Sequence, residues 1–250
     1  MLYVTDGTKE GFLTAFLAAF SDADALLVSD QAVTQLPLTA LPITIQPDLT
    51  RAEKAAKRLQ QFDKHFLHDL DFLLRSGNEN NLQIAFAYCK RLAEIKHPIS
   101  SRLSEPAVYD AVALIRQVGF EIHRFHGFIR FMESASGALY APFSPDNDIC
   151  DLLVPHFRAR LPEYPFVLHD VKRKKAAVYD GQHCFCAPLE KADILLSANE
   201  LGWQSLWKEY YGAVNIPLRE RLKQMRGYMP KRYWAFMPER QNPPENSKKD

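Results

Sequence analysis

The sequence has few cysteines, and their spacing favours neither a disulfide framework nor a metal site. Cys89, Cys150, Cys184 and Cys186 include no C-x-x-C pair, although Cys184 and Cys186 would point to one face of a strand. Isolated thiols of this kind are typical of a reducing compartment. We therefore expect a cytoplasmic protein whose cysteines bind no metal.

Long apolar runs are also missing. No segment approaches the ~18–20 apolar residues of a membrane-spanning helix, and the N-terminus lacks the basic start and continuous apolar stretch of a secretory signal. The 250 residues are 47% hydrophobic and 24% charged, which is typical of a globular chain. We expect no membrane association, and a core built as one elaborate domain or two small ones.

No familiar catalytic or cofactor motif occurs in the chain. The G-x-S-x-G, Walker and G-x-G-x-x-G patterns are absent, so no nucleophile is identified and no cofactor is expected. The pairs His65/His68 and His123/His126 could each place two imidazoles on one helix face. Because no Cys or carboxylate at a recognisable spacing completes either set, we expect no metal site.

The net charge is only +1, but it is unevenly distributed. The segment 207–236 carries seven Lys or Arg and two Glu, a local charge of +5, together with seven aromatic residues. Cationic side chains attract phosphates and aromatic faces stack on bases. The segment therefore predicts a nucleic-acid-binding surface; the alternative is a solvated helix face whose aromatics serve the core.

A two-faced helix is expected over 215–229, from an Asn215 cap to the break at Pro230. Its apolar stripe is Leu218, Leu222, Met225 and Met229, and its basic stripe is Arg219, Lys223 and Arg226. An extended path is expected after Pro230. There Lys231 and Arg232 would reach phosphate, Tyr233 would stack on a base, and Trp234 would be buried.

A second basic cluster lies at an expected hairpin tip, 169–175, with a local charge of +3. Its cations Lys172, Arg173, Lys174 and Lys175 are either a phosphate clamp or an ordinary solvated turn. Arg124 and Arg130 flank Gly127, where a helix gives way to a strand. They would bind a phosphate or form structural ion pairs with carboxylates.

The periodicity predicts an α+β fold. A short strand at 2–5 opens a mainly helical N-terminal region over 1–105, with helices at 8–20, 50–75 and 81–95 and a strand at 43–45. A region over 106–192 begins with a helix and continues as an antiparallel sheet in the order β-β-α-β-β-β, with its helix packed on one face. Two helices form a basic aromatic region over 193–238, and residues 239–250 are expected to be a disordered tail.

Several segments resemble a bacterial family assigned to DNA metabolism or DNA repair. The clearest matches are W-K-E-Y-Y at 207–211, M-P-K-R-Y-W at 229–234 and H-R-F-H-G-F-I-R-F at 123–131, and shorter matches extend over nearly the whole chain. Members of that family are encoded beside a radical-SAM protein, and a homologous domain is fused to a uracil-DNA glycosylase in some of them. The resemblance implies a DNA-repair setting and a radical-SAM partner. It carries over no glycosylase activity, because no glycosylase domain follows Trp234.

Three hypotheses follow, and the first is favoured. The chain is a DNA-binding or accessory protein acting with a radical-SAM partner. Alternatively, it is an enzyme acting on nucleic acid through the region of Arg124, Arg130, His169 and Asp170. The third hypothesis is a scaffold whose basic face binds an acidic protein.

Overall fold

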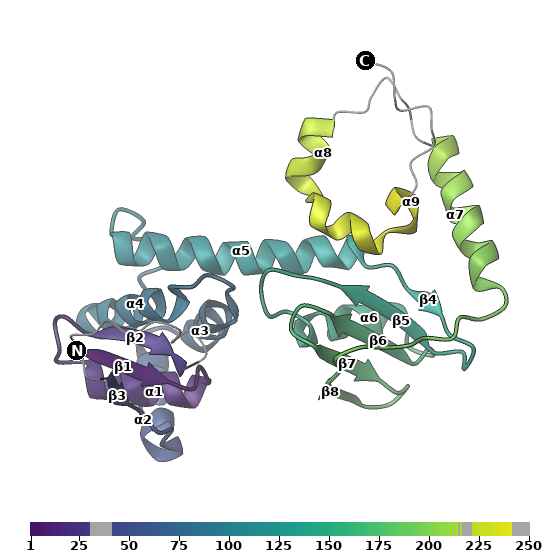
Figure 1. Ribbon diagram of the computed structural model, residues 1–250. Coiled ribbons are helices and arrows are strands. Elements are labelled where there is room, and N and C mark those ends of the chain that lie inside the picture. The colour runs from purple at the N-terminus through teal and green to yellow at the C-terminus, as the bar shows by residue number, and fades with distance from the viewer. Residues whose placement is uncertain (31–41, 215, 217–221, 242–250) are drawn as a thin grey trace. The chain divides into compact units, whose positions relative to one another are not determined.

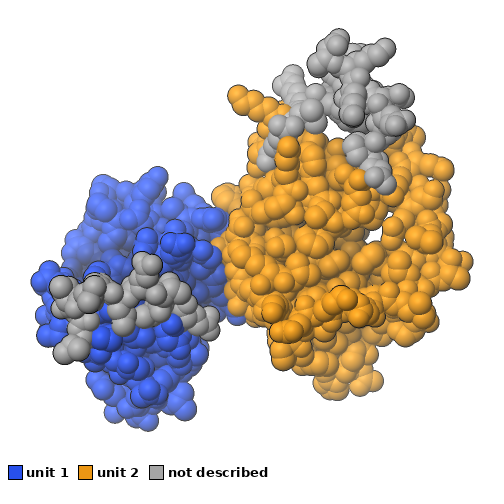
Figure 2. Space-filling model, in the orientation of Figure 1, with its two compact units in different colours: residues 1–119 blue, residues 120–250 orange. Residues whose placement is uncertain are grey.

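The structure is a computed structural model that describes residues 1–30, 42–214, 216 and 222–241 (Figure 1). The chain divides into two compact units, Met1–Gly119 and Phe120–Asp250, which Figure 2 distinguishes by colour. The fold is α+β, as the periodicity predicts.

The first unit contains a small parallel sheet and four helices before the long helix α5. Strand β1 (Leu2–Thr5) lies at the centre of the sheet, between β2 (Leu26–Ser29) and β3 (Pro42–Thr44). The helices are α1 (Lys9–Ala19), α2 (Leu49–Phe62), α3 (Phe66–Arg75) and α4 (Asn81–Ile95). Their apolar faces supply most of one buried cluster that includes Phe12, Phe66 and Leu92. Strand β2 was not expected from the sequence.

The single helix expected over 50–75 is interrupted at Asp63. The backbone of Asp63 is extended, and its buried carboxylate accepts the backbone N–H of His65 at 2.9 Å. A side chain that bonds the next turn in this way ends one helix and starts another. Helices α2 and α3 are therefore separate, and the prediction of one long helix was wrong.

The second unit is built on a five-stranded sheet in the order β4-β5-β6-β7-β8. Its strands are β4 (Met132–Glu133), β5 (Leu139–Phe143), β6 (Phe166–Asp170), β7 (Lys175–Tyr179) and β8 (Cys184–Pro188). The order of elements is the predicted one, with η2 (Asp151–Leu153) and α6 (Val154–Arg160) between β5 and β6. Strands β5 and β6 are parallel, however, so the sheet is mixed. A helical crossover between neighbouring strands permits this arrangement, whereas a short hairpin does not.

Helix α5 (Pro106–Phe128) precedes the sheet, and four short or medium elements follow it (Figure 1). They are α7 (Glu200–Val214), α8 (Leu222–Tyr228), η4 (Lys231–Phe236) and α9 (Pro238–Gln241). Residues Asn215, Leu218 and Arg219 of the expected helix lie outside the described residues. Within the described ranges, no helix has the length and apolar character needed to span a bilayer.

Candidate nucleic-acid interface

The two basic clusters predicted from the sequence meet at one loop of the second unit. Arg173, in the turn between β6 and β7, donates from Nη1 to the Pro145 carbonyl oxygen at 3.1 Å and from Nη2 to that of Asp146. Arg232, in η4, pairs with the Asp146 carboxylate. Asp146 therefore joins the turn to the segment after Pro230, although 59 residues separate the two arginines in sequence.

Beneath Asp146 lies a buried carboxylate that fixes the loop in place. Glu121 of α5 accepts the backbone N–H of Asp146 at 2.9 Å, that of Asn147 at 2.8 Å, and the Asn147 side-chain amide at 2.7 Å. It also accepts the hydroxyl of Tyr233 at 2.8 Å. Four donors satisfy a buried charge that would otherwise be costly. Glu121 thus connects α5, the 145–147 loop and η4.

The turn between β6 and β7 is held by a second buried carboxylate. Asp170 has no exposed surface, and it accepts the backbone N–H groups of Lys172 and Arg173, each at 3.1 Å. The Arg173 guanidinium completes the set at 3.1 Å from Oδ2. Lys174 adopts a left-handed backbone conformation with φ 52°, which closes the turn. Arg173 is therefore a structural ion, whereas Lys172 and Lys174 are exposed.

Tyr233 is buried, and its assignment as a base-stacking residue was wrong. Its side chain is 2% exposed, and its ring lies 4.5 Å from Phe125 between ring centroids. Burial, followed by the charge of Glu121, raises the pKa of Tyr233 well above its ordinary value. The expected extended path after Pro230 was also wrong, because 231–236 form a 3-10 helix. This winding turns Tyr233 inward and leaves Trp234 half-buried, whereas we expected Trp234 to be buried and Tyr233 to be available to a base.

The two arginines around Gly127 have separate contacts. Arg130 donates to Glu239 Oε1 from Nε at 3.1 Å and from Nη2 at 2.8 Å, and it lies 5.4 Å from the Trp207 ring centroid. The Glu239 side chain is only 3% exposed, so Arg130 is a structural ion, the second of the two predicted alternatives. Arg124 donates to the Gly227 carbonyl oxygen at 3.4 Å.

The aromatic residues of the C-terminal segment serve mostly internal contacts. Arg240 lies 4.9 Å from the ring centroid of Tyr211 and 5.4 Å from that of Trp234. The Trp234 indole donates to the Met229 carbonyl oxygen at 3.1 Å. The rings of Trp207, Tyr211 and Trp234 thus each lie against an arginine of this chain, so their faces are partly occupied.

The remaining predicted cations differ in exposure and in their partners. Lys223 on α8 and Lys231 on η4 are exposed, while Lys175 is half-buried and pairs with Asp148. Arg219 lies outside the described residues, and the side chain of Arg226 is also not described. Three exposed lysines adjoin the two arginines that contact the 145–146 segment: Lys172 and Lys174 on either side of Arg173, and Lys231 next to Arg232. We call these three residues the lysine surface. Lys174 also makes an exposed ion pair with Glu190 at 3.2 Å.

The residues of the enzyme hypothesis do not converge on one site. His169 is buried, with Nδ1 2.6 Å from the Tyr140 hydroxyl and Nε2 2.9 Å from the Leu189 carbonyl oxygen. Both ring nitrogens are therefore engaged, and Asp170 is committed to its turn. Among the described residues, no three His, Cys, Asp or Glu side chains gather as metal ligands.

A stacked histidine pair was not foreseen. The rings of His126 and His156 are 4.0 Å apart between centroids and nearly parallel. Burial lowers the pKa of His126, and the neighbouring imidazoles of His156 and His123 lower it further. No local sequence signal could have paired these two residues, because they lie on different helices.

A family model described as a domain of unknown function, DUF4130, matches residues 79–239. No curated protein and no solved structure matches the chain. The matched range includes the 145–147 loop, the turn between β6 and β7, and η4.

Proposed function

The chain belongs to the DUF4130 family, and from this premise we propose that it is a cytoplasmic DNA-binding protein of DNA repair or DNA metabolism that acts with a radical-SAM protein. The lysine surface is its phosphate contact. The observation that carries the proposal is the shared attachment of the two basic segments to Asp146.

The different contacts of the arginines and the lysines support this proposal. Arg173 and Arg232 each bind Asp146, and their guanidinium groups are used to build the surface. Lys172, Lys174 and Lys231 extend from the segments so fixed. Lysine is a flexible point charge that contacts phosphate without demanding a fixed geometry. Binding through it is expected to depend on charge more than on base sequence.

The test is a triple change of Lys172, Lys174 and Lys231 to Ala. If each lysine contacts one phosphate, the slope of log K against log salt should flatten by roughly 2–3 on duplex DNA. Affinity at low salt should fall at the same time. Fluorescence anisotropy with a labelled duplex, measured across a salt series, gives both quantities.

The matched control removes three exposed lysines from the first unit, Lys54, Lys57 and Lys64. This variant has the same change in net charge, so its salt slope should stay at the wild-type value. An equal loss in both triple variants would mean that net charge alone governs binding. Unchanged binding by the folded Lys172/Lys174/Lys231 variant would refute the proposed surface.

A specific observation also supports the protein partner. Four apolar side chains on α7 are more than half exposed at the spacing of one helix face: Trp203, Leu206, Tyr210 and Val214. Together they expose roughly 400–500 Å² of apolar surface, the size of the largest patches on monomeric proteins, which are often functional. We assign this α7 stripe to the radical-SAM protein implied by the sequence resemblance.

The partner assignment is tested with purified proteins. Changing Trp203 and Tyr210 to Ser should abolish binding to a radical-SAM protein of the kind encoded beside members of the resembled family, as measured by isothermal titration calorimetry. Leu201→Ser is the control, because Leu201 is 71% exposed but lies about 160° around the helix from Trp203. Full binding by the double variant would refute the assignment.

A further inference from the structure

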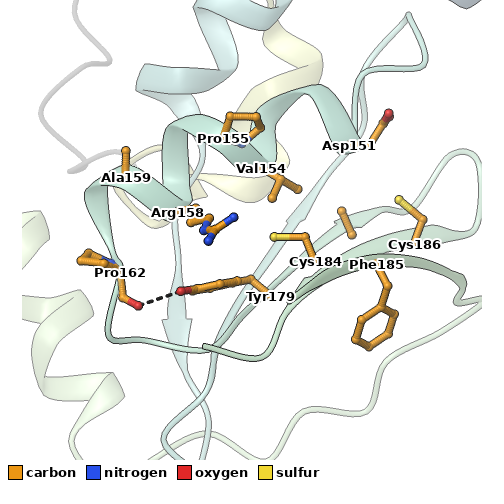
Figure 3. Close-up of a pocket in the computed structure, with 11 residues that line it drawn as sticks. Asp151, Val154, Pro155, Arg158, Ala159, Pro162, Tyr179, Cys184, Phe185 and Cys186 are labelled. Atoms are coloured by element: carbon orange, nitrogen blue, oxygen red, sulfur yellow. Dashed lines mark hydrogen bonds between the residues drawn. The ribbon is translucent and has the colours of Figure 1, made fainter. Parts of the chain in front are cut away.

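A pocket of about 790 Å³ lies between α6 and the strands β7 and β8 (Figure 3). Helix α6 and the segment after it line one side with Val154, Pro155, Arg158, Ala159 and Pro162. The volume is within the range of small-ligand sites, which combine mostly apolar walls with a few polar groups. Among the described residues, none of those considered above for phosphate binding lines it.

The sheet side of the pocket follows from strand register. Ala177 and Tyr179 share one face of β7, and their partners across the ladder are Cys186 and Cys184 of β8. All four side chains therefore face α6, while the ring of Phe185 points away from the helix (Figure 3). The Tyr179 hydroxyl is fixed by the carbonyl oxygens of Pro162 and Gly181, at 2.9 and 2.7 Å. Tyr179 is thus an anchored part of the wall.

Arg158 is the cation among the described residues that line this pocket. Its guanidinium lies 5.7 Å from the Tyr179 ring centroid. No ion pair within the described ranges joins Arg158 to a carboxylate, in contrast to Arg130, Arg173 and Arg232. The pocket's carboxylate, Asp151, lies toward its other end (Figure 3). An anionic group of a ligand would therefore be directed to Arg158.

We propose that this pocket binds a nucleotide, with the base between α6 and the sheet and the phosphate at Arg158. Guanidinium planes stack on aromatic rings and pair with phosphates, and soft sulfur atoms make favourable contacts with aromatic rings. A planar aromatic ring with an anionic substituent would pair with Arg158, contact the sulfur of Cys184 and pack against the apolar walls. The bound nucleotide is either a free mononucleotide or one unit of a bound nucleic-acid strand. The second possibility rests on the function proposed above.

Binding of one unit of a nucleic-acid strand is compatible with the position of the lysine surface in the fold. Strand β7 begins at Lys175, immediately after Lys174, and Ala177 of the pocket lies two residues further along. Two strand residues span about 7 Å. The pocket is therefore lined by the same β-strand, β7, that starts at the basic turn.

The chain carries its own reporter of pocket occupancy. Cys184 and Cys186 are exposed, whereas Cys89 and Cys150 are buried. Burial raises the pKa of Cys150 to about 12 and raises that of Cys89 further. At pH 8, iodoacetamide should therefore modify the pocket thiols selectively, because the thiolate is the reactive form. Peptide mass spectrometry gives the rate at each cysteine.

Two ligands are then added separately: an equimolar mixture of the four deoxynucleoside 5′-monophosphates at millimolar concentration, and a 12-nucleotide single strand. Bound nucleotide should slow alkylation of Cys184 at least fivefold. Arg158→Gln should abolish this protection. Arg160→Gln should retain it, because Arg160 is also an exposed arginine of α6 but does not line the pocket.

The variant with Lys172, Lys174 and Lys231 changed to Ala separates the two sources. Protection by the strand that is lost in this variant, while protection by mononucleotides persists, identifies a unit of a bound strand. Protection by mononucleotides alone, without any strand binding, supports the pocket and identifies a free mononucleotide as its ligand. If neither ligand protects Cys184, or if Arg158→Gln is protected as well as wild type, the nucleotide proposal is overturned, even where the lysine surface binds the strand.

Discussion

The hydroxyl of Tyr233 is expected to contribute measurably to the stability of the second unit. Tyr233→Phe keeps the buried ring and its contact with Phe125, and it removes only the donor to Glu121 at 2.8 Å. A hydrogen bond to a charged group contributes about 1.5–3 kcal/mol. The carboxylate keeps three other donors, from Asp146 and Asn147, so it is not left unsatisfied. The loss should therefore stay within this range.

Thermal and urea unfolding at pH 7 measure the effect. A loss of 1.5–3 kcal/mol corresponds to a fall in Tm of roughly 3–12 °C for a domain of this size. Tyr228→Phe is the matched control, because Tyr228 is 68% exposed and lies only five residues away. Its change should remain within about 0.5 kcal/mol.

The pH dependence gives a second signature of the same contact. The pKa of Tyr233 is raised in the folded chain, so the protonated phenol is the form that folding favours. The associated stability is fully present below pH 10, the ordinary pKa, and is lost as pH rises above it. Tyr233→Phe should remove this part of the alkaline sensitivity. A Tm within 1 °C of wild type for Tyr233→Phe would refute the assignment of Glu121 and Tyr233 as a stabilising pair.

Three further outcomes are expected. Arg130→Met should destabilise by about 3–5 kcal/mol in urea unfolding, because it leaves Glu239 as a buried unpaired charge, and adding Glu239→Gln should recover most of that loss. Because the pKa of His126 is lowered, folding favours the neutral imidazole, and the stability linked to it is present above pH 6.5 and is lost as pH falls. His126→Phe should therefore flatten the dependence of Tm on pH between pH 7 and 5. An unchanged dependence would exclude the stacked histidine pair as the cause of the loss of stability at low pH. Elemental analysis of the purified protein should give no stoichiometric zinc or iron, and EDTA should leave Tm unchanged; a metal whose removal unfolds the chain would contradict this.

Much of the secondary structure could be predicted because its signals are local. Strand β1 begins and ends where the pattern predicts, and β3 differs from its predicted range by one residue at either end. Helix α4 likewise spans Asn81–Ile95 as expected. The turn residues and the alternation of side chains fix these elements without reference to distant parts of the chain.

The roles of the arginines could not be predicted, because their partners are distant in sequence. Glu239 is 109 residues from Arg130, and Asp146 is 86 residues from Arg232. A basic stripe that will bind phosphate and one that will pair with buried carboxylates have the same local pattern. Only the fold decides between them.

The prediction of an extended path after Pro230 failed for a different reason. Proline ends a helix, but it does not dictate an extended path afterwards, because its own φ also suits the first turn of a new helix. The 3-10 winding of 231–236 changed which aromatic side chain faces the core. One backbone choice therefore buried Tyr233 and left Trp234 half-buried.

Arg232 already holds an anion, and that has a consequence for binding. Asp146 is a tethered competitor: any phosphate that engages Arg232 must displace a carboxylate whose effective concentration is on the order of millimolar or higher. Free phosphate at lower concentration cannot do so efficiently. Under the proposed function, a strand first anchored by Lys231 would present its next phosphate at a comparable local concentration, and that phosphate could then compete with the Asp146 carboxylate for Arg232. Arg232 would thus respond to polymeric anions and discriminate against small ones, a threshold set by the neighbouring loop and not by the arginine itself.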